Sequence, residues 1–421
     1  MDDQKYLDAL RREIKPALGC TEPIAVALAV VRAREALDCM PERIDLAVSR
    51  NILKNAMGVG IPGTGMVGLE IASALGCIAG HSCYGLEVLS GATREECEQA
   101  KAMVGEGRIH VQAKETDKKL YIEARVSAGE HEAVCIIEDT HTGVTYLACD
   151  GHVIEQREGQ TRHPGAEAAH DLSVAGIFEF IRRVDVKELG FLREAIAMND
   201  AIAAEGLQQD YGMRVGKVLQ SGRAMETMPV SEYAAAYTAA AADARMAGCM
   251  LPVMSTAGSG NQGICASLPV VATARKLGAD EEAMLRAEAL SQLITIHIKT
   301  YIGRLSPLCG CAIASSIGSA CGVVYLMGGG LEQIHFAIQN MIADISGLIC
   351  DGAKSSCALK IASSVASAMQ CAQLAMAGVG ATSLDGIIAA DVENSIRNLA
   401  NLGSEGMKRT DRVILDMMIA K

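Results

Sequence analysis

One long stretch without any charged residue limits the folds that this chain can adopt. It covers residues 310–331, and glycine, alanine, serine and cysteine supply most of its side chains. The stretch is long enough to span a bilayer, but Tyr325 is its single aromatic residue and no aromatic belt flanks it. Helices that are apolar on all sides also form the centre of large helical domains. We therefore expect a buried core helix, with a multi-helix membrane transporter as the alternative.

Charge and cysteine content narrow the possible partners and the compartment. The net charge of −12 argues against nucleic acid and anionic membranes as partners, since both bind basic surfaces. Residues 1–5 are polar and acidic and lack the apolar core of a signal peptide. Without an export signal, the 15 cysteines are expected to be reduced thiols or metal ligands rather than disulfides. We therefore expect a cytoplasmic protein.

Hydrophobic periodicity separates helical parts of the chain from a mixed part. Residues 3–18 and 24–37 have helical spacing, and helical spacing dominates again from Leu172 onward. Alternating apolar and polar residues between these parts predict strands at 44–49, 108–113, 120–126 and 133–138, with helices near 66–81 and 93–104. Half-polar strands of this kind suit an antiparallel sheet with one face open to solvent.

These patterns predict an α+β fold with three segments. The length of 421 residues allows two or three domains. A mainly helical catalytic domain is expected at 171–421, and N-terminal helices at 1–38 join it. An antiparallel α+β domain is inserted at 39–170, and its last part, 156–170, has the polar composition of a linker.

A glycine-rich stretch at 54–65 follows a predicted strand and leads into a helix. Three glycines have the spacing of the dinucleotide-binding fingerprint: Gly58, Gly60 and Gly63. Pro62 removes a backbone N–H from this loop, and the strands around it lack the alternating pattern of a Rossmann domain. An NAD-linked enzyme is therefore the weaker interpretation. Lys54, Asn55 and the amides of Gly58 and Gly60 could instead bind a carboxylate, unless the loop is a plain structural turn.

A second polar loop precedes a later helix and is a further candidate for binding a small anion. Its central residues are Ser259, Gly260, Asn261 and Gln262. Amides at the start of a helix favour a negatively charged ligand. Farther along, His297 and Lys299 lie on the helix that leads to Cys309 and are candidates for a general base, as is Lys54. A hydrogen-bonded core histidine is the alternative for His297.

Four cysteines fall in two pairs about forty residues apart, each beside glycine: Cys309 and Cys311, then Cys350 and Cys357. Thiolates ligate iron–sulfur clusters and zinc, and the Cys-Gly-Cys spacing is not that of a zinc ribbon. Ordinary buried cysteines are the alternative. Cys20 lies between Gly19 and a predicted helix, where the helix N-terminus favours a thiolate.

Three motifs resemble those of the L-cysteine desulfidase family. They are Gly-Cys-Thr-Glu-Pro at 19–23, Ser-Thr-Ala-Gly-Ser-Gly-Asn-Gln-Gly at 255–263, and Ile-Cys-Asp-Gly-Ala-Lys at 349–354. This oxygen-sensitive, PLP-independent group of iron–sulfur enzymes is related to the α-chain of bacterial L-serine dehydratase. The resemblance spans almost the whole chain.

The resemblance implies a [4Fe–4S] cluster held by three cysteines, with one iron open to substrate. The Cys-Asp-Gly motif makes Cys350 the clearest ligand, and the partner about forty residues earlier is Cys309 or Cys311. The third ligand is Cys20 in the desulfidase pattern. The dehydratase pattern places it eleven residues after Cys350, where this chain has Ile361, so the nearby Cys357 is the second choice.

The implied reaction is the β-elimination of L-cysteine to pyruvate, ammonia and hydrogen sulfide. Dehydration of L-serine to pyruvate and ammonia is the alternative. Cys20 would act as ligand or catalytic thiol, and the base stays open among Lys54, His297 and Lys299. The expected partner is thus a small amino acid, and assembly as a homodimer is left open.

Overall fold

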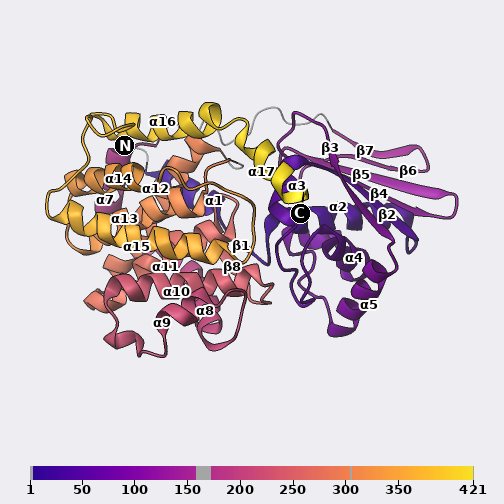
Figure 1. The fold of residues 1–421 in the computed structure, drawn as a ribbon, viewed down its shortest axis with the longest axis horizontal. Helices are drawn as coiled ribbons and strands as arrows, with labels where there is room; N and C mark the ends of the chain where they lie inside the picture. The colour runs from indigo at the N-terminus through magenta and orange to yellow at the C-terminus, as the bar shows by residue number, and fades with distance from the viewer. Residues whose placement is uncertain (1–2, 158–171, 304–305, 421) are drawn as a thin grey trace.

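The computed structural model describes residues 3–157, 172–303 and 306–420. Figure 1 shows two bodies side by side, a helical body and a body in which a six-stranded sheet packs on helices. Each body has its own cluster of buried apolar side chains. The α+β fold class predicted from the sequence is confirmed. The predicted linker at 156–170 lies, from residue 158 on, outside the described residues.

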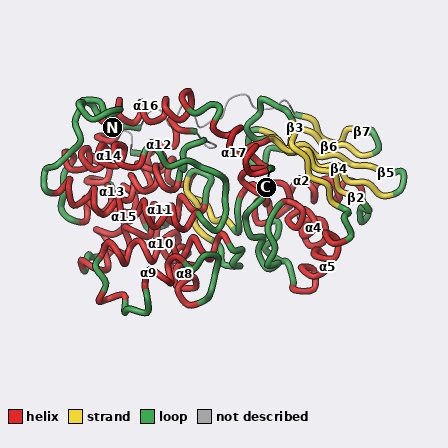
Figure 2. Tube along the Cα trace, in the orientation of Figure 1, coloured by secondary structure: helices red, strands yellow, loops and turns green. Residues whose placement is uncertain are grey.

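The sheet of the α+β body forms from the strands that alternation predicts. Its strands are β2 (Arg43–Ser49), β3 (Ile109–Lys114), β4 (Tyr121–Ala128), β5 (His131–Glu138), β6 (Val144–Cys149) and β7 (His152–Gln156). Its helices are α2 (Thr21–Leu37), α3 (Arg50–Ala56), α4 (Leu69–Ala79), η1 (Ser82–Glu87) and α5 (Arg94–Gly105). In Figure 2 the helices lie along one face of the sheet, where Ile44, Leu46 and Val48 of β2 are buried.

One edge of this sheet departs from the predicted antiparallel arrangement. The strand order is β3-β2-β4-β5-β6-β7, and β3 runs parallel to β2 while the other pairs in the described sheet are antiparallel. The reason lies in the connection, because α3, α4 and α5 all intervene between β2 and β3. A crossover of that length returns the chain to the same edge and makes a parallel pair possible.

The helical body contains most of the rest of the described chain. Its helices are α1 (Gln4–Glu13), α7 (Val174–Arg183), η2 (Val186–Leu189), α8 (Leu192–Gln208), α9 (Val215–Gln220), η3 (Met225–Thr227), α10 (Val230–Met246), α11 (Gly260–Leu277), α12 (Glu281–Ile302), η4 (Cys311–Ser315), α13 (Ser316–Leu326), α14 (Leu331–Ile345), α15 (Cys357–Met376), α16 (Val392–Asn401) and η5 (Leu402–Gly406). The last helix, α17 (Thr410–Ile419), packs on α3 of the α+β body. A two-stranded ribbon joins β1 (Ile14–Ala17) to β8 (Val253–Thr256).

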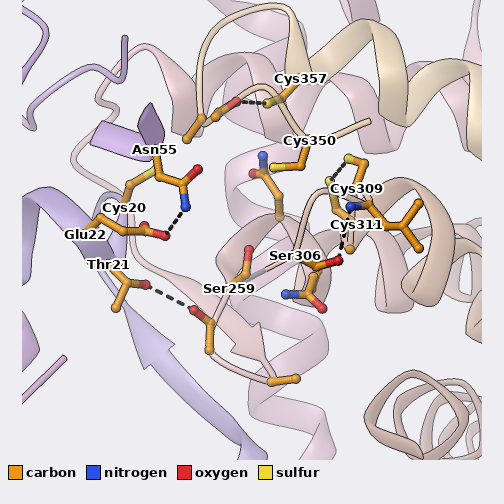
Figure 3. Close-up of a pocket in the computed structure, with 18 of the residues that line it drawn as sticks. Cys20, Thr21, Glu22, Asn55, Ser259, Ser306, Cys309, Cys311, Cys350 and Cys357 are labelled. Atoms are coloured by element: carbon orange, nitrogen blue, oxygen red, sulfur yellow. Dashed lines mark hydrogen bonds between the residues drawn. The ribbon is translucent and has the colours of Figure 1, made fainter. Parts of the chain in front are cut away.

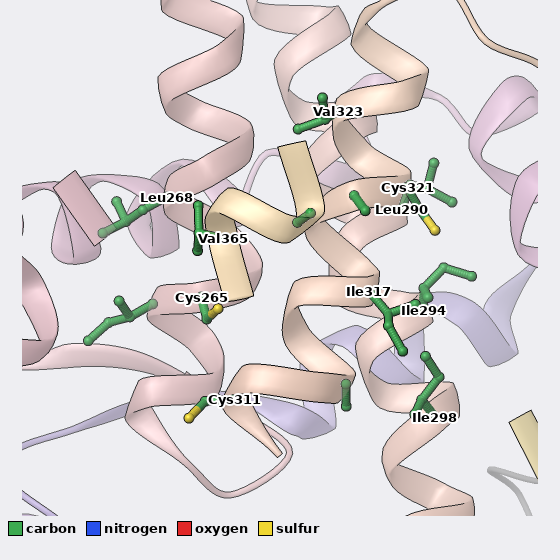
Figure 4. Packing of buried hydrophobic residues seen from close by; sticks show 14 of the residues in the cluster. Cys265, Leu268, Leu290, Ile294, Ile298, Cys311, Ile317, Cys321, Val323 and Val365 are labelled. Atoms are coloured by element: carbon green, nitrogen blue, oxygen red, sulfur yellow. The ribbon is translucent and has the colours of Figure 1, made fainter. Parts of the chain in front are cut away.

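The charge-free stretch forms the centre of the helical body. Figure 4 shows side chains of α11, α12, α13 and α15 packed together, among them Leu268, Ile294 and Val365. Glycine permits the close contact, since a Cβ on Gly318 would lie 2.3 Å from the Thr295 hydroxyl oxygen. None of the helices in the described residues combines the length and the apolar character that a membrane span requires. The transporter alternative is therefore not supported.

The N-terminal segment differs from the single helix predicted for residues 3–18. Helix α1 ends at Glu13, and Ile14–Ala17 pairs in antiparallel register with Val253–Thr256. Pro16 fits there because a proline is tolerated in an edge strand. The apolar clusters divide residues 1–38 between the bodies, since α1 packs in the helical body and α2 packs on the sheet. We propose that the domain boundary lies between β1 and α2 rather than at residue 38.

Candidate active site

The two bodies meet at a cavity of about 110 Å³. The α+β body contributes the start of α2 and the side chains of Asn55 and His141. The helical body contributes the glycine loop (257–262), the first cysteine loop (306–311) and the second cysteine loop (350–357). In Figure 3, Cys20, Glu22 and Asn55 lie on one side of the cavity, and Cys309, Cys311 and Cys350 lie on the other.

Backbone pairing holds the two cysteine loops together. The amide of Cys309 donates to the carbonyl of Leu348 at 2.9 Å, and the amide of Cys350 donates to the carbonyl of Pro307 at 2.6 Å. The Sγ atoms of Cys309 and Cys311 lie 3.5 Å apart. The Cys311 thiol lowers the pKa of Cys309 by hydrogen bonding to it, which favours a thiolate at Cys309.

Cys20 and Cys357, which also line the cavity, lie at the N-terminal ends of α2 and α15. Cys357 is the first residue of α15, and its thiol donates to the Gly352 carbonyl at 3.6 Å. Burial raises the pKa of Cys357 to about 12. Burial likewise raises the pKa of Cys20 to about 11, although the Arg245 guanidinium opposes this shift. The expectation that the helix N-terminus would lower the pKa of Cys20 is therefore wrong, because desolvation is the larger effect.

The donors in this cavity fit an iron–sulfur cluster by their chemistry. Five thiols from three separate segments line the same small space: Cys20, Cys309, Cys311, Cys350 and Cys357. Thiolate sulfur is the ligand that iron–sulfur clusters prefer. Within the described ranges, no three His, Cys, Asp or Glu side chains converge closely enough to hold a single metal ion.

Two glycines in and just after the glycine loop, Gly260 and Gly263, are packed too tightly to be replaced by residues with a side chain. A Cβ on Gly263 would lie 1.9 Å from the Met254 carbonyl oxygen, and one on Gly260 would lie 2.3 Å from Arg245 Nε. Both Asn261 and Gln262 are buried and line the cavity, as Ser259 does. Gly260 does not line the cavity, and its role is to make room for the Arg245 side chain.

The first glycine-rich stretch, 54–65, serves a different purpose from the predicted ligand loop. Gly58 forms a β-bridge with Lys354, and the Gly60 amide donates to the Met246 carbonyl at 2.9 Å. A Cβ on Gly60 would lie 2.4 Å from the Ala247 carbonyl carbon. Neither Gly58 nor Gly60 lines the cavity. These glycines let the two bodies approach each other, and only Asn55 of this stretch reaches the cavity.

Two of the three predicted bases lie outside the cavity lining. His297 is fully buried on α12, and its Nε2 lies 2.8 Å from Glu393 Oε2, so it fastens α16 as a core histidine does. Lys54 is buried, pairs with Asp411 and donates to the Cys350 carbonyl at 3.2 Å. Of the three, only Lys299 lines the cavity, and its Nζ donates to the Gly303 carbonyl at 2.6 Å.

The cavity also contains charged residues that the sequence patterns did not single out as functional. They are Glu22, Arg245, Asp351 and Lys360. Asp351 and Lys360 form an ion pair next to Cys350. Arg245 lies near the end of an alanine-rich helix and has no motif around it, so only its packing beside Gly19 and Cys20 in the folded chain reveals it.

Comparison with known protein families identifies the family of this chain. The family model described as the serine dehydratase alpha chain matches residues 83–416, and this chain belongs to that family.

Relatives are similar over their full length. The chain is 46% identical to a UPF0597 protein of Clostridium perfringens over 418 residues, which cover 99% of this chain and 98% of the relative. It is 46% identical to a UPF0597 protein of Oleidesulfovibrio alaskensis over 420 residues, with 99% and 98% covered. It is also 47% identical to a UPF0597 protein of Bacteroides fragilis over 423 residues, with 100% and 99% covered.

Proposed function

We propose that this protein is an iron–sulfur lyase that converts L-cysteine to pyruvate, ammonia and hydrogen sulfide. One observation carries the proposal: five cysteine thiols from distant parts of the chain line a single small cavity. The serine dehydratase alpha chain family supports the lyase class. It also supports dehydration of L-serine as the second candidate, since both reactions remove a β-substituent from a small amino acid.

The cysteine loops are the proposed holders of a [4Fe–4S] cluster. Cys350 and one of the pair Cys309 and Cys311 would supply two ligands, and Cys20 or Cys357 the third. When bound, such a cluster with one open iron would act as a Lewis acid toward the leaving group of the substrate. Backbone hydrogen bonds between the two loops hold Cys309 and Cys350 at the cavity.

The remaining cavity residues are proposed to hold the substrate and move its proton. Ser259, Asn261 and Gln262 would bind the substrate, and Lys299 Nζ would accept the α-proton as a general base. The C–S bond then breaks, hydrogen sulfide leaves, and aminoacrylate remains. Water converts aminoacrylate to pyruvate and ammonia.

The test is turnover by protein purified without oxygen and offered both amino acids together. Sulfide and pyruvate should form in equal amounts from L-cysteine, and pyruvate without sulfide would identify L-serine as the substrate. Pyruvate from neither amino acid, in protein with a full complement of iron, would contradict the proposal.

Cysteine variants test the cluster itself. Cys350→Ala should give folded protein that lacks iron and the broad absorption near roughly 400 nm of thiolate-bound iron. Cys309→Ala and Cys311→Ala should lose iron in only one of the two. Cys371→Ala is the matched control, because Cys371 is buried but lies outside the cavity. Full iron content in Cys350→Ala would remove this residue from the ligand set.

A further inference from the structure

Two opposite charges in the cavity have no ion-pair partner among the described residues. Glu22 accepts a hydrogen bond from the Asn55 amide at 3.2 Å. Arg245 donates to Asn261 Oδ1 at 3.0 Å and to the Gly19 carbonyl at 2.7 Å. All of these partners are neutral, as is the Cys20 thiol beside Arg245, whereas Asp351, which lines the same cavity, pairs with Lys360.

Leaving these charges without partners is costly. Arg245 is 4% exposed, and its Nε has no hydrogen-bond partner. A buried charge without a countercharge loses the free energy of its hydration, so buried charges are normally paired within the protein. A buried charge that lacks such a partner is therefore a candidate for binding a ligand of opposite charge. Its two neutral contacts fix the plane of the guanidinium group, which prepares it for a carboxylate.

The Glu22 side of the cavity is suited to a cation. Glu22 lies in the first turn of α2 and is half-buried. The Oδ1 atom of Asn55 is buried without a partner. The amide orientation is determined by its neighbour, because the opposite orientation would place Oδ1 against the Glu22 carboxylate. Two acceptors therefore face the cavity together, and an ammonium group supplies donors for both.

We propose that Glu22 and Arg245 recognise the two charged ends of a free α-amino acid. The α-ammonium group binds Glu22 and Asn55 Oδ1, and the α-carboxylate binds Arg245. This inference rests on the proposed function for the substrate class and narrows it to amino acids with both charges free. N-Acylated amino acids, 2-hydroxy acids and amino-acid amides each lack one charge and bind weakly.

This assignment also orients the substrate. Glu22 and Asn55 lie beside Cys20 in Figure 3, and the cysteine loops lie across the cavity. Arg245 belongs to the Cys20 side, since it donates to the carbonyl of Gly19. With both charged groups held there, the β-substituent points toward Cys309, Cys311 and Cys350. The leaving group is thus presented to the loops that are proposed to hold the cluster.

Calorimetric binding to anaerobic holoenzyme tests the proposal with two unreactive probes of the same shape. L-2-Aminobutyrate carries both charges, and (S)-2-hydroxybutyrate lacks the ammonium group. Glu22→Gln should weaken binding of L-2-aminobutyrate about tenfold or more and leave binding of (S)-2-hydroxybutyrate unchanged. Arg245→Gln should weaken both probes. Glu70→Gln should change neither, because Glu70 is an exposed acid in the first turn of α4.

The Glu22→Gln variant tests the proposal even if Arg245→Gln fails to fold, because only the loss of a bond to the ammonium group weakens one probe and not the other. Equal weakening of both probes, or of neither, would overturn the proposal. Normal binding of L-2-aminobutyrate to the Glu22→Gln variant, combined with slow turnover of L-cysteine, would also overturn it. Glu22 would then act on the reaction rather than on recognition. The expected pattern without any elimination activity would support this inference and overturn the proposed function.

Discussion

Glu288 is a fully buried acid that lies beneath the glycine loop. Its Oε1 accepts a hydrogen bond from Gln292 at 2.8 Å, and Gln292 Oε1 accepts one from the Thr256 hydroxyl at 2.6 Å. Burial raises the pKa of Glu288 from 4.5 to about 7. Thr256 closes the turn at the start of the glycine loop through its backbone bond with Ser259. The buried acid therefore supports the loop that borders the cavity.

This raised pKa predicts the sign of a pH effect on stability. Between pH 4.5 and about 7 the folded chain keeps the Glu288 proton that the unfolded chain releases. The free energy of unfolding should therefore fall as pH rises through this range, by about 3 kcal/mol at most, and then level off. Urea unfolding at several pH values should show a smaller fall in Glu288→Gln. Glu282→Gln, an exposed acid on the same helix, should keep the wild-type slope, and equal slopes in all three proteins would contradict the prediction.

At the scale of elements, a substitution at Gly60 tests whether the glycine-rich stretch 54–65 packs the two bodies together or binds a ligand. A Cβ at this position would meet the backbone at the end of α10, where the two bodies touch. Gly60→Ala should lower the free energy of unfolding by about 1–3 kcal/mol, as overpacking does. Gly91→Ala is the control, because a Cβ there meets nothing within 4 Å. Chemical denaturation measures both. A stable Gly60→Ala variant that binds L-2-aminobutyrate poorly would restore the ligand-loop interpretation.

Elements with a strong local pattern could be predicted from the sequence. Alternation located β2, β4 and β5 to within a few residues, because each has one buried and one solvated face. The ribbon of β1 and β8 could not be predicted, since each strand has four residues and its partner lies far away along the chain. Strands this short carry too few residues for a period, and only tertiary pairing defines them.

The same distinction holds for the site. Cysteine and glycine motifs identified most of the cavity lining, because thiols and tight turns require particular residues. Arg245 and the true surroundings of His297 and Lys54 depend on which helices pack together. A sequence pattern shows that a residue is polar, but it does not show whether a carboxylate such as Asp411 or Glu393 will neutralise it.

At the scale of the whole molecule, α17 connects the two bodies. Its Asp411 pairs with Lys54 of α3, which is 2% exposed and also bonds to the second cysteine loop. Asp411→Asn should lower the free energy of unfolding by about 1–3 kcal/mol, because the buried ammonium group loses its carboxylate. Asp416→Asn removes an exposed partner of Arg50 and should cost less than about 1 kcal/mol. Equal decreases in the free energy of unfolding of the two variants, measured with denaturant, would show that the buried pair stabilises the protein no more than the exposed pair does.

The pairing of β1 with β8 also bears on biosynthesis. During translation Cys20 leaves the ribosome early, while Val253–Thr256 and the second cysteine loop follow much later. Domains fold as units as they emerge, N-terminal first. The α+β body can therefore fold before the helical body, which contributes the other side of the cavity, has been made. A cofactor that needs thiols from both bodies can be bound by all of its ligands only after the second cysteine loop has been made.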